Sequence, residues 1–232
     1  MQNVTDVGFI IHSRPYHENS RLLELFTLVH GRVSAVARLS KGKSASGSAV
    51  LQPFVPLSFS WFSSANLVTL SDYHQTHREF SMQVPYIFSA LYANELLYFL
   101  YKDRETPITL FSAYAALLET LADRADPTVR LREYELELLA SLGVALRLPT
   151  REDDIDAQAW YVFSTERGFY RCSQTNDCFP ERYRGAELQA AVSLGYRSPL
   201  VKKITQQVLN ELLQGRKLHS RQMYLDFLRY GV

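Results

Sequence analysis

The chain has 232 residues, of which 47% are apolar, and its formal net charge is +1. This composition is too apolar and too close to neutral for an intrinsically disordered protein. The small total charge also excludes a polycation that binds nucleic acid over its whole surface, so a nucleic-acid site must come from local segregation of charge. The length is sufficient for two domains of ordinary size.

The N-terminal part of the chain contains five short apolar runs that are typical of β-strands. These runs are residues 7–11, 20–27, 32–38, 57–62 and 67–70, and a loop rich in Ser, Gly, Ala and Lys, residues 40–48, interrupts them. Five strands of this size suit a small closed or partly open barrel, and the barrel of this size that most often binds nucleic acid is the OB-fold. We therefore predict a five-stranded OB-fold barrel as a DNA-binding domain, residues 1–81.

From Pro85 onward the apolar residues recur at helical spacing instead of alternating. The pattern predicts helices over residues 86–101, 108–125, 127–142, 185–194, 199–213 and 220–228. Two aromatic-rich runs that flank a short turn predict a β-hairpin near residues 159–173. We therefore expect an α+β protein in which the barrel is followed by a mainly helical C-terminal domain, residues 82–232, with this small β-hairpin.

Positive charge is concentrated in the predicted barrel. Between residues 12 and 50 the only acids are Glu18 and Glu24, whereas the basic residues are Arg14, Arg21, Arg32, Arg38, Lys41 and Lys43. Basic side chains bind phosphates and release the counterions condensed around them, and an aromatic ring such as that of Tyr16 can stack on a base. We predict that these six residues bind DNA. The alternative is that they only solubilise a barrel with another role.

A second group of basic residues lies near the C-terminal end of the chain. Its members are Arg197, Lys202, Lys203, Arg216, Lys217, His219 and Arg221, interrupted only by Glu211. We predict that Lys202, Lys203, Arg216 and Lys217 extend the DNA path across the helical domain. The alternative is that these cations only complement the dipoles of helix ends.

Signals for a metal or a catalytic group are weak. Cys172 and Cys178 lie six residues apart, and no histidine lies between residues 78 and 218. A structural zinc site needs four N or S ligands, so we predict no metal, and we expect no other cofactor. The chain also lacks a phosphate-binding Gly-rich loop and a Gly-x-Ser-x-Gly elbow. We therefore expect no catalytic residues. A nuclease that binds magnesium through Asp153, Asp154 and Asp156 is the alternative.

The sequence carries no sign of export or of a membrane span. Its first residues lack a basic patch followed by an apolar run, and the apolar segment 86–101 contains Asn94 and Glu95 and is too short for a bilayer. We expect a soluble cytoplasmic protein, associated with the nucleoid, without a membrane partner.

Several segments, taken in order, resemble the bacterial RecO family of recombination mediators. Residues 9–20 with Leu22 and Leu23 resemble the first hairpin of that family, residues 31–37 its third strand, and residues 51–57 the next strand. Residues 94–97 and 131–143 resemble two helices of its second domain. The resemblance covers nearly the whole chain, and the ordered set is more specific than any one motif.

The resemblance implies a protein without a known enzymatic active site. It implies binding to single- and double-stranded DNA, annealing of complementary strands, and action with RecR to load RecA onto DNA covered by single-stranded DNA-binding protein. Many members of the family have a denser basic cluster in the loop that holds Lys41 and Lys43 here, and some carry a four-cysteine zinc site near the hairpin.

The resemblance also implies that the helical domain docks the C-terminal tail of single-stranded DNA-binding protein. An arginine beside apolar side chains suits an acidic peptide that ends in a hydrophobic residue, so we predict that Arg132, Leu136 and Leu139 bind this tail. The alternative is an ion pair from Arg132 to Glu135 or a neighbouring acid on a solvated helix face.

Two other functions remain open from the residues themselves. An OB-fold protein that binds RNA or tRNA is the main alternative, because contacts to the backbone look alike for both polymers. A structural adaptor without affinity for nucleic acid is the other alternative.

Overall fold

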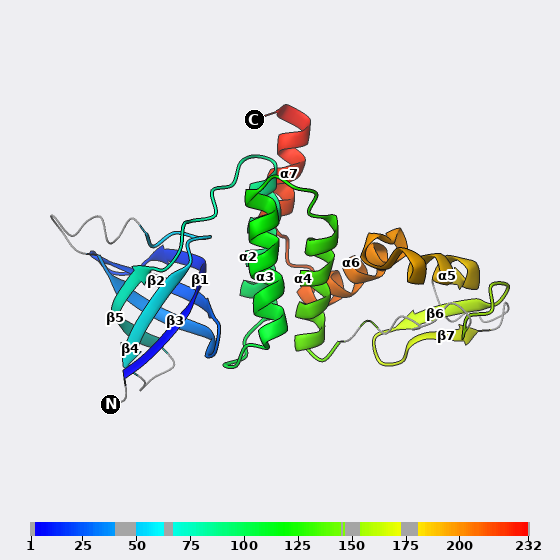
Figure 1. The fold of residues 1–232 in the computed structure, drawn as a ribbon, viewed down its shortest axis with the longest axis horizontal. Helices are drawn as coiled ribbons and strands as arrows, with labels where there is room; N and C mark the ends of the chain where they lie inside the picture. Colours follow the sequence, from blue (N-terminus) through cyan, green and yellow to red (C-terminus); the bar gives the residue numbers. More distant parts are fainter. Residues whose placement is uncertain are drawn as a thin grey trace. The chain divides into compact units, whose positions relative to one another are not determined.

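The computed structural model describes residues 3–39, 50–62, 67–144, 146, 154–172 and 181–231 (Figure 1). The chain forms two compact units: unit 1 comprises residues 1–126 with 217–232, and unit 2 comprises residues 127–216. Unit 1 therefore contains two helices and a C-terminal segment in addition to the barrel. The domain boundary near residue 82, which rests on the change in periodicity, stays a prediction.

The barrel of unit 1 is built from five strands, as the sequence predicts. They are β1 (Asn3–Pro15), β2 (Ser20–Thr27), β3 (Gly31–Arg38), β4 (Leu57–Phe62) and β5 (Leu67–Gln75). The barrel closes in the order β1-β2-β3-β5-β4, and every pair is antiparallel except β3 with β5. β1 and β5 are longer than the apolar runs 7–11 and 67–70 that predicted them, because polar residues next to these runs also pair with the neighbouring strands.

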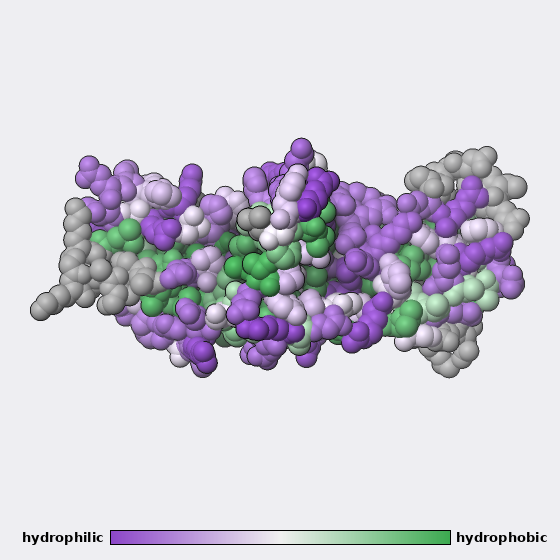
Figure 2. All heavy atoms as spheres, turned by 90° about the horizontal axis from the view of Figure 1, so that it is seen from above, coloured by the Kyte–Doolittle hydropathy of each residue, from purple (hydrophilic) through white to green (hydrophobic). Residues whose placement is uncertain are grey.

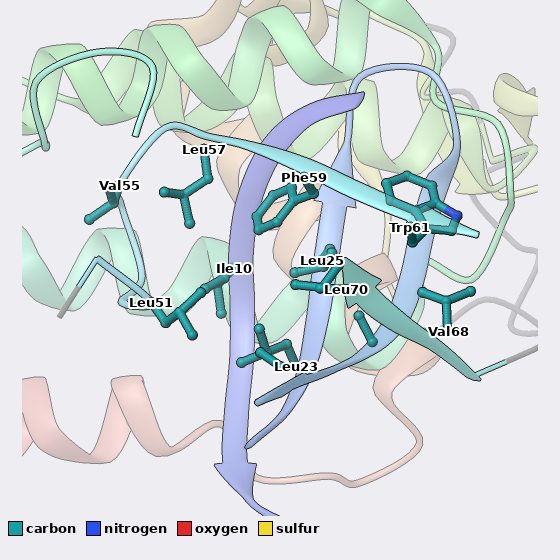
Figure 3. Packing of buried hydrophobic residues seen from close by; sticks show 12 residues of the cluster. Ile10, Leu23, Leu25, Leu51, Val55, Leu57, Phe59, Trp61, Val68 and Leu70 are labelled. Atoms are coloured by element: carbon teal, nitrogen blue, oxygen red, sulfur yellow. The ribbon is translucent and has the colours of Figure 1, made fainter. Parts of the chain in front are cut away.

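Alternating side chains fill the interior of the barrel (Figure 3). Leu23 and Leu25 on β2 are fully buried, while Glu24 between them points to the other side of the strand. Ile10, Leu57 and Phe59 are also fully buried in this cluster. Burying one such side chain contributes about 1.5–3 kcal/mol, so this cluster is a major source of the barrel's stability.

Two helices of unit 1, α2 (Tyr86–Leu100) and α3 (Ile108–Ala122), pack against the outside of the barrel. Phe9 on β1 and Phe26 on β2 lie opposite each other in the ladder, and both contact the ring of Tyr114 on α3, with centroids 5.3 and 5.6 Å apart. The Tyr114 hydroxyl donates a 2.6 Å hydrogen bond to Oδ1 of Asn94 on α2. The helices therefore cover this part of the barrel wall.

The last helix of the chain, α7 (His219–Tyr230), packs on α2. The ring of Phe88 contacts those of Tyr224 and Phe227, and the carboxylate of Glu95 accepts hydrogen bonds from the backbone N–H groups of His219 and Ser220 at 2.9 and 3.0 Å. A side chain of α2 thus satisfies the free amides at the start of α7. The predicted helix over residues 220–228 is confirmed, but its return to unit 1 was not predicted.

The apolar face of α7 is only partly covered. Met223, Leu225, Leu228 and Tyr230 remain between 46% and 73% exposed. On the face of the molecule drawn in Figure 2, most of the surface is hydrophilic and hydrophobic residues show in separate patches. No described helix is long and apolar enough to cross a membrane.

The described residues of unit 2 form three helices and a small sheet. Its elements are α4 (Thr128–Ser141), β6 (Trp160–Ser164), β7 (Gly168–Cys172), β8 (Tyr183–Arg184), α5 (Gly185–Leu194), the 3₁₀ turn η2 (Gly195–Arg197) and α6 (Pro199–Leu213). The predicted hairpin is confirmed as β6 and β7, and β8 adds a third strand in the order β7-β6-β8. α4 ends before Gly143, whose φ of +78° is readily adopted by glycine.

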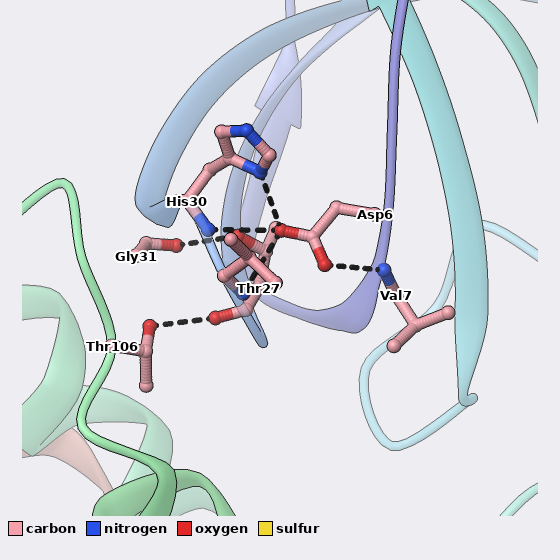
Figure 4. Close-up of polar contacts among 7 residues, drawn as sticks. Asp6, Val7, Thr27, His30, Gly31 and Thr106 are labelled. Atoms are coloured by element: carbon pink, nitrogen blue, oxygen red, sulfur yellow. Dashed lines mark hydrogen bonds and ion pairs between the residues drawn. The ribbon is translucent and has the colours of Figure 1, made fainter.

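The turn between β2 and β3 is held by Asp6 (Figure 4). Its Oδ2 accepts hydrogen bonds from the backbone N–H groups of Val29 and His30 at 3.0 and 2.9 Å and lies 2.8 Å from Nδ1 of His30. At Gly31, which follows, φ is +62°, and a Cβ atom would lie 2.2 Å from the carbonyl oxygen of Asp103. Position 31 therefore requires glycine, because the backbone has a positive φ there and the segment between α2 and α3 leaves no room for a side chain.

Candidate nucleic-acid interface

Three of the predicted DNA-binding arginines lie at one end of the barrel. Arg21 on β2 is opposite Pro15 on β1 and Ala37 on β3, whereas Arg14 is opposite Leu22 and Arg38 is opposite Ser20. Neighbouring residues of a strand point to opposite sides of the sheet, so Arg14 and Arg38 lie on the outer side of the barrel wall and Arg21 lies on the side of the buried Ala37. All three stand at the end of the barrel where β1 ends, β2 begins and β3 ends. We call Arg14, Arg21 and Arg38 the arginine end.

The arginine end is open and positively charged. Arg14 and Arg38 are exposed and Arg21 is partly exposed. None of the three forms an ion pair with a carboxylate of the described residues. Along the chain, Glu18, an exposed residue in the turn between β1 and β2, is the nearest acid to Arg14, and Glu18 and Glu24 are equally near to Arg21. Lys41 and Lys43, which the sequence adds to this set, lie outside the described residues.

The turn between β1 and β2 carries two aromatic rings into this neighbourhood. The rings of Tyr16 and His17 meet edge to face, with centroids 4.2 Å apart. The N–H of Tyr16 donates to the carbonyl of Ser20 at 2.9 Å, and the N–H of Leu39, just after β3, donates to the carbonyl of Asn19 at 2.8 Å. Three strands therefore fix the position of this turn.

Arg32 contacts both its own barrel wall and α2, and its predicted contact with DNA stays a prediction. Its Nε donates to Glu24 at 2.9 Å, its Nη1 donates to the carbonyls of Tyr98 and Tyr101 at 2.6 and 3.2 Å, and its guanidinium lies 4.9 Å from the centroid of the Tyr98 ring. The side chain is 16% exposed. Arg32 is on the part of the wall that α2 covers, where it binds carbonyls at the end of that helix.

His12 lies beside Arg32 and adds no positive charge at neutral pH. Its ring stacks on Tyr98 with centroids 4.3 Å apart. Burial lowers the pKa of His12, and the charges of Arg14 and Arg32 lower it further, while Glu24 acts in the opposite direction. The imidazole is therefore neutral and packs as an aromatic ring.

The second basic group is divided between the two units. Lys202 is exposed on α6, whereas Nζ of Lys203 lies 3.0 Å from Oε2 of Glu181 and 5.4 Å from the centroid of the Tyr183 ring. Arg216 is an exposed residue of unit 2, and Lys217 is an exposed residue of unit 1. A continuous DNA path through these residues stays a prediction.

Arg132 is buried, and its predicted contact with the tail peptide stays a prediction. On α4 its guanidinium donates to the carboxylate of Glu135, and the two side chains are 4% and 2% exposed. An ion pair between Arg132 and Glu135 is the alternative that the sequence analysis left open. It was expected on a solvated helix face, whereas here both side chains are buried. Leu139 is fully buried and Leu136 partly exposed. Within the described residues, Nε of Arg132 has no hydrogen-bond partner.

Metal ligands do not cluster in the described part of the chain. No group of three or more His, Cys, Asp or Glu side chains is placed to hold an ion there. Cys172 is a free thiol, and Cys178 and Asp153 lie outside the described residues. Asp156 pairs with Arg171 at 3.1 Å. The expectation that the chain binds no zinc stays a prediction.

The chain is similar to known proteins over nearly its whole length. Residues 1–77 match the family model described as "Recombination protein O N terminal", and residues 85–222 match "Recombination protein O C terminal". The chain is 34% identical over 230 residues to the DNA repair protein RecO of Tolumonas auensis, with 95% of each chain covered.

Two further relatives have the same name. The chain is 33% identical over 243 residues to the DNA repair protein RecO of Nitrosococcus oceani, covering 100% of this chain and 96% of the relative. It is 31% identical over 231 residues to the one of Haemophilus influenzae, covering 97% of each. The chain therefore belongs to the RecO family, and this membership supports a role in DNA repair and recombination.

Proposed function

We propose that this protein is a recombination mediator that binds single- and double-stranded DNA at the arginine end of its barrel. The observation that carries the proposal is that Arg14, Arg21 and Arg38 stand at the same end of β1, β2 and β3, without a carboxylate partner among the described residues. Guanidinium groups donate to phosphate oxygens in a planar, bidentate geometry, and the release of counterions drives the association.

The proposed mechanism depends on position and charge, and the protein is not an enzyme. Two complementary strands that are held on one cationic surface repel each other less, because the arginines screen their phosphates. Annealing of complementary strands follows from this screening without a reacting side chain. In the cell the protein would work with RecR to load RecA onto DNA covered by single-stranded DNA-binding protein.

A charge-reversal series tests the DNA-binding part of this proposal. Arg14→Glu, Arg21→Glu and Arg38→Glu are each expected to weaken binding to DNA by about fivefold or more at low salt, since each removes one favourable ion pair and adds repulsion. Arg229→Glu, at an exposed position of α7, changes the net charge equally and is expected to have less than about a twofold effect. Fluorescence anisotropy with labelled DNA measures both.

Three results would contradict the proposal. If Arg229→Glu lost as much affinity for DNA as the three test variants, net charge alone would determine binding. Tighter binding to a matched RNA strand would favour the RNA-binding alternative. Sustained cleavage of labelled DNA with magnesium would show that the protein is a nuclease.

We further propose that α4 docks the acidic C-terminal tail of single-stranded DNA-binding protein through Arg132, Leu136 and Leu139. The unpartnered Nε of Arg132 and the partly exposed Leu136 support this assignment. A peptide carboxylate would have to replace Glu135 as the partner of the guanidinium, because this ion pair is buried.

Titration with a labelled tail peptide tests this docking. Replacing Arg132 alone removes the ion-pair partner of the buried Glu135 carboxylate, which is strongly destabilising, whereas the double variant Arg132→Ala/Glu135→Ala removes both charges. We expect a folded double variant that has lost affinity for the peptide. A folded double variant that binds the peptide as tightly as the wild type would exclude Arg132 from the site.

A further inference from the structure

The turn between β1 and β2 presents two aromatic rings beside the three arginines. Tyr16 is partly exposed and His17 is exposed, and among the described residues the only aromatic ring that each contacts is the other. Chain order places this turn directly between Arg14 and Arg21. A polymer that lies with its phosphates on the arginine end therefore passes next to these rings.

The turn is held in position before any ligand binds. Its backbone hydrogen bonds reach β2 through the carbonyl of Ser20, and the residue after β3 through the N–H of Leu39. His17 has a φ of +51°, a left-handed conformation that is unfavourable for a residue with a side chain. Because the conformation is fixed in advance, stacking on the rings loses little conformational entropy.

Unpaired bases are the chemical group that suits this surface. Every base has a flat π-face that can stack on an aromatic side chain, whatever the sequence of the strand. In a duplex these faces are covered by neighbouring base pairs, whereas the phosphates remain accessible. Rings beside arginines therefore discriminate between single and double strands, and arginines alone do not.

We propose that Tyr16 and His17 form a stacking platform for unpaired bases, which gives the arginine end a preference for single-stranded DNA. This inference rests on the proposed function of the arginine end and names two residues that determine its specificity. The phosphates supply affinity common to all strands, and the rings add affinity only where bases are unstacked.

The test compares a strand with bases and a strand without them. The ligands are an oligo-dT strand of about 15 nucleotides, within the site size of one OB-fold, and an abasic strand of equal length. The variant is Tyr16→Leu combined with His17→Gly, because leucine keeps apolar bulk without a π-face and glycine accepts the φ of residue 17 without strain. Tyr16→Phe keeps the ring and is the matched control.

Wild type and Tyr16→Phe are expected to bind oligo-dT at least about fivefold more tightly than the abasic strand. The double variant is expected to lose this difference while it binds the abasic strand, and a hairpin duplex, as the wild type does. A wild type that binds both single strands equally, or a double variant that retains the preference, would overturn the inference. If the wild type binds neither strand at low salt, the proposed function itself fails.

Glu18 provides an independent measurement on the same turn. Its exposed carboxylate lies next to the rings along the chain and repels phosphate. Glu18→Gln is expected to strengthen binding to oligo-dT and to the abasic strand by the same factor, because it changes charge and not stacking. A gain confined to oligo-dT would show that charge and stacking are not separable at this turn, which contradicts the proposed division of roles.

Discussion

Asp6 is the residue whose surroundings link the stability of the barrel to pH. Burial alone would raise the pKa of its carboxyl group, but hydrogen bonds from the His30 side chain and from the backbone of His30, Val29 and Val7 lower the pKa below the ordinary value of 3.8. A carboxylate with a lowered pKa stabilises the folded state above pH 3.8, and this contribution is lost as pH falls through the folded-state pKa.

Asp6→Asn is therefore expected to destabilise the protein at pH 7 and to matter less in acid. The amide keeps one acceptor oxygen but cannot accept the whole set of hydrogen bonds, so the expected loss is about 1–3 kcal/mol. Urea denaturation at neutral and at acidic pH measures the difference. Asp72→Asn, at a carboxylate that is 71% exposed, is the control and should change stability by less than about 0.5 kcal/mol. A constant difference at both pH values would contradict this role of Asp6.

Single residues were the least predictable level of this molecule. Arg14, Arg32 and Arg38 look equivalent in the sequence, yet Arg32 lies under α2 and pairs with Glu24, whereas no ion pair is described for the other two. The difference depends on which part of the barrel wall a helix covers, and strand periodicity carries no information about that. The i,i+3 spacing did signal the Arg132–Glu135 pair, but not its burial.

The elements themselves follow closely from the sequence. Apolar alternation predicted β2 and β4 at their observed bounds, and helical spacing predicted α5 and α6 at theirs. The second half of β5 was missed, because exposed residues such as Asp72 and His74 break the apolar pattern and are held only by the ladder with β4. β8 is two residues long and has no periodicity to detect.

The contact between α2 and α7 makes a prediction at the level of elements. Glu95→Ala removes the acceptor for the first amides of α7, and losing a cap of this kind costs about 0.5–2 kcal/mol. We expect the amides of residues 219–230 to exchange with solvent about 2- to 30-fold faster, as measured by hydrogen exchange. Glu119→Ala, at an exposed position of α3, is the control. Unchanged exchange in Glu95→Ala would show that ring packing alone holds α7.

At the level of the whole molecule, a net charge of +1 conceals a local positive site. The salt dependence of binding should therefore follow the arginine end and not the total charge. For single strands, the logarithm of the binding constant falls with the logarithm of salt concentration by about 0.7 for each phosphate neutralised. Replacing Arg14, Arg21 and Arg38 together by Gln is expected to reduce this slope by about 2.

Anisotropy titrations at several salt concentrations measure this slope. Arg229→Gln, outside the arginine end, is expected to leave it unchanged. A triple variant with the slope of the wild type would mean that the DNA phosphates contact other cations.

Unit 1 is discontinuous along the chain, and this has a consequence for biosynthesis. The barrel, α2 and α3 leave the ribosome first, but α7, which covers Phe88 and binds Glu95, is made only after all of unit 2. During translation the nascent N-terminal part therefore exposes an apolar strip around Phe88 until residues 217–231 have been synthesised. Chaperones that recognise exposed apolar segments would meet the protein at this stage.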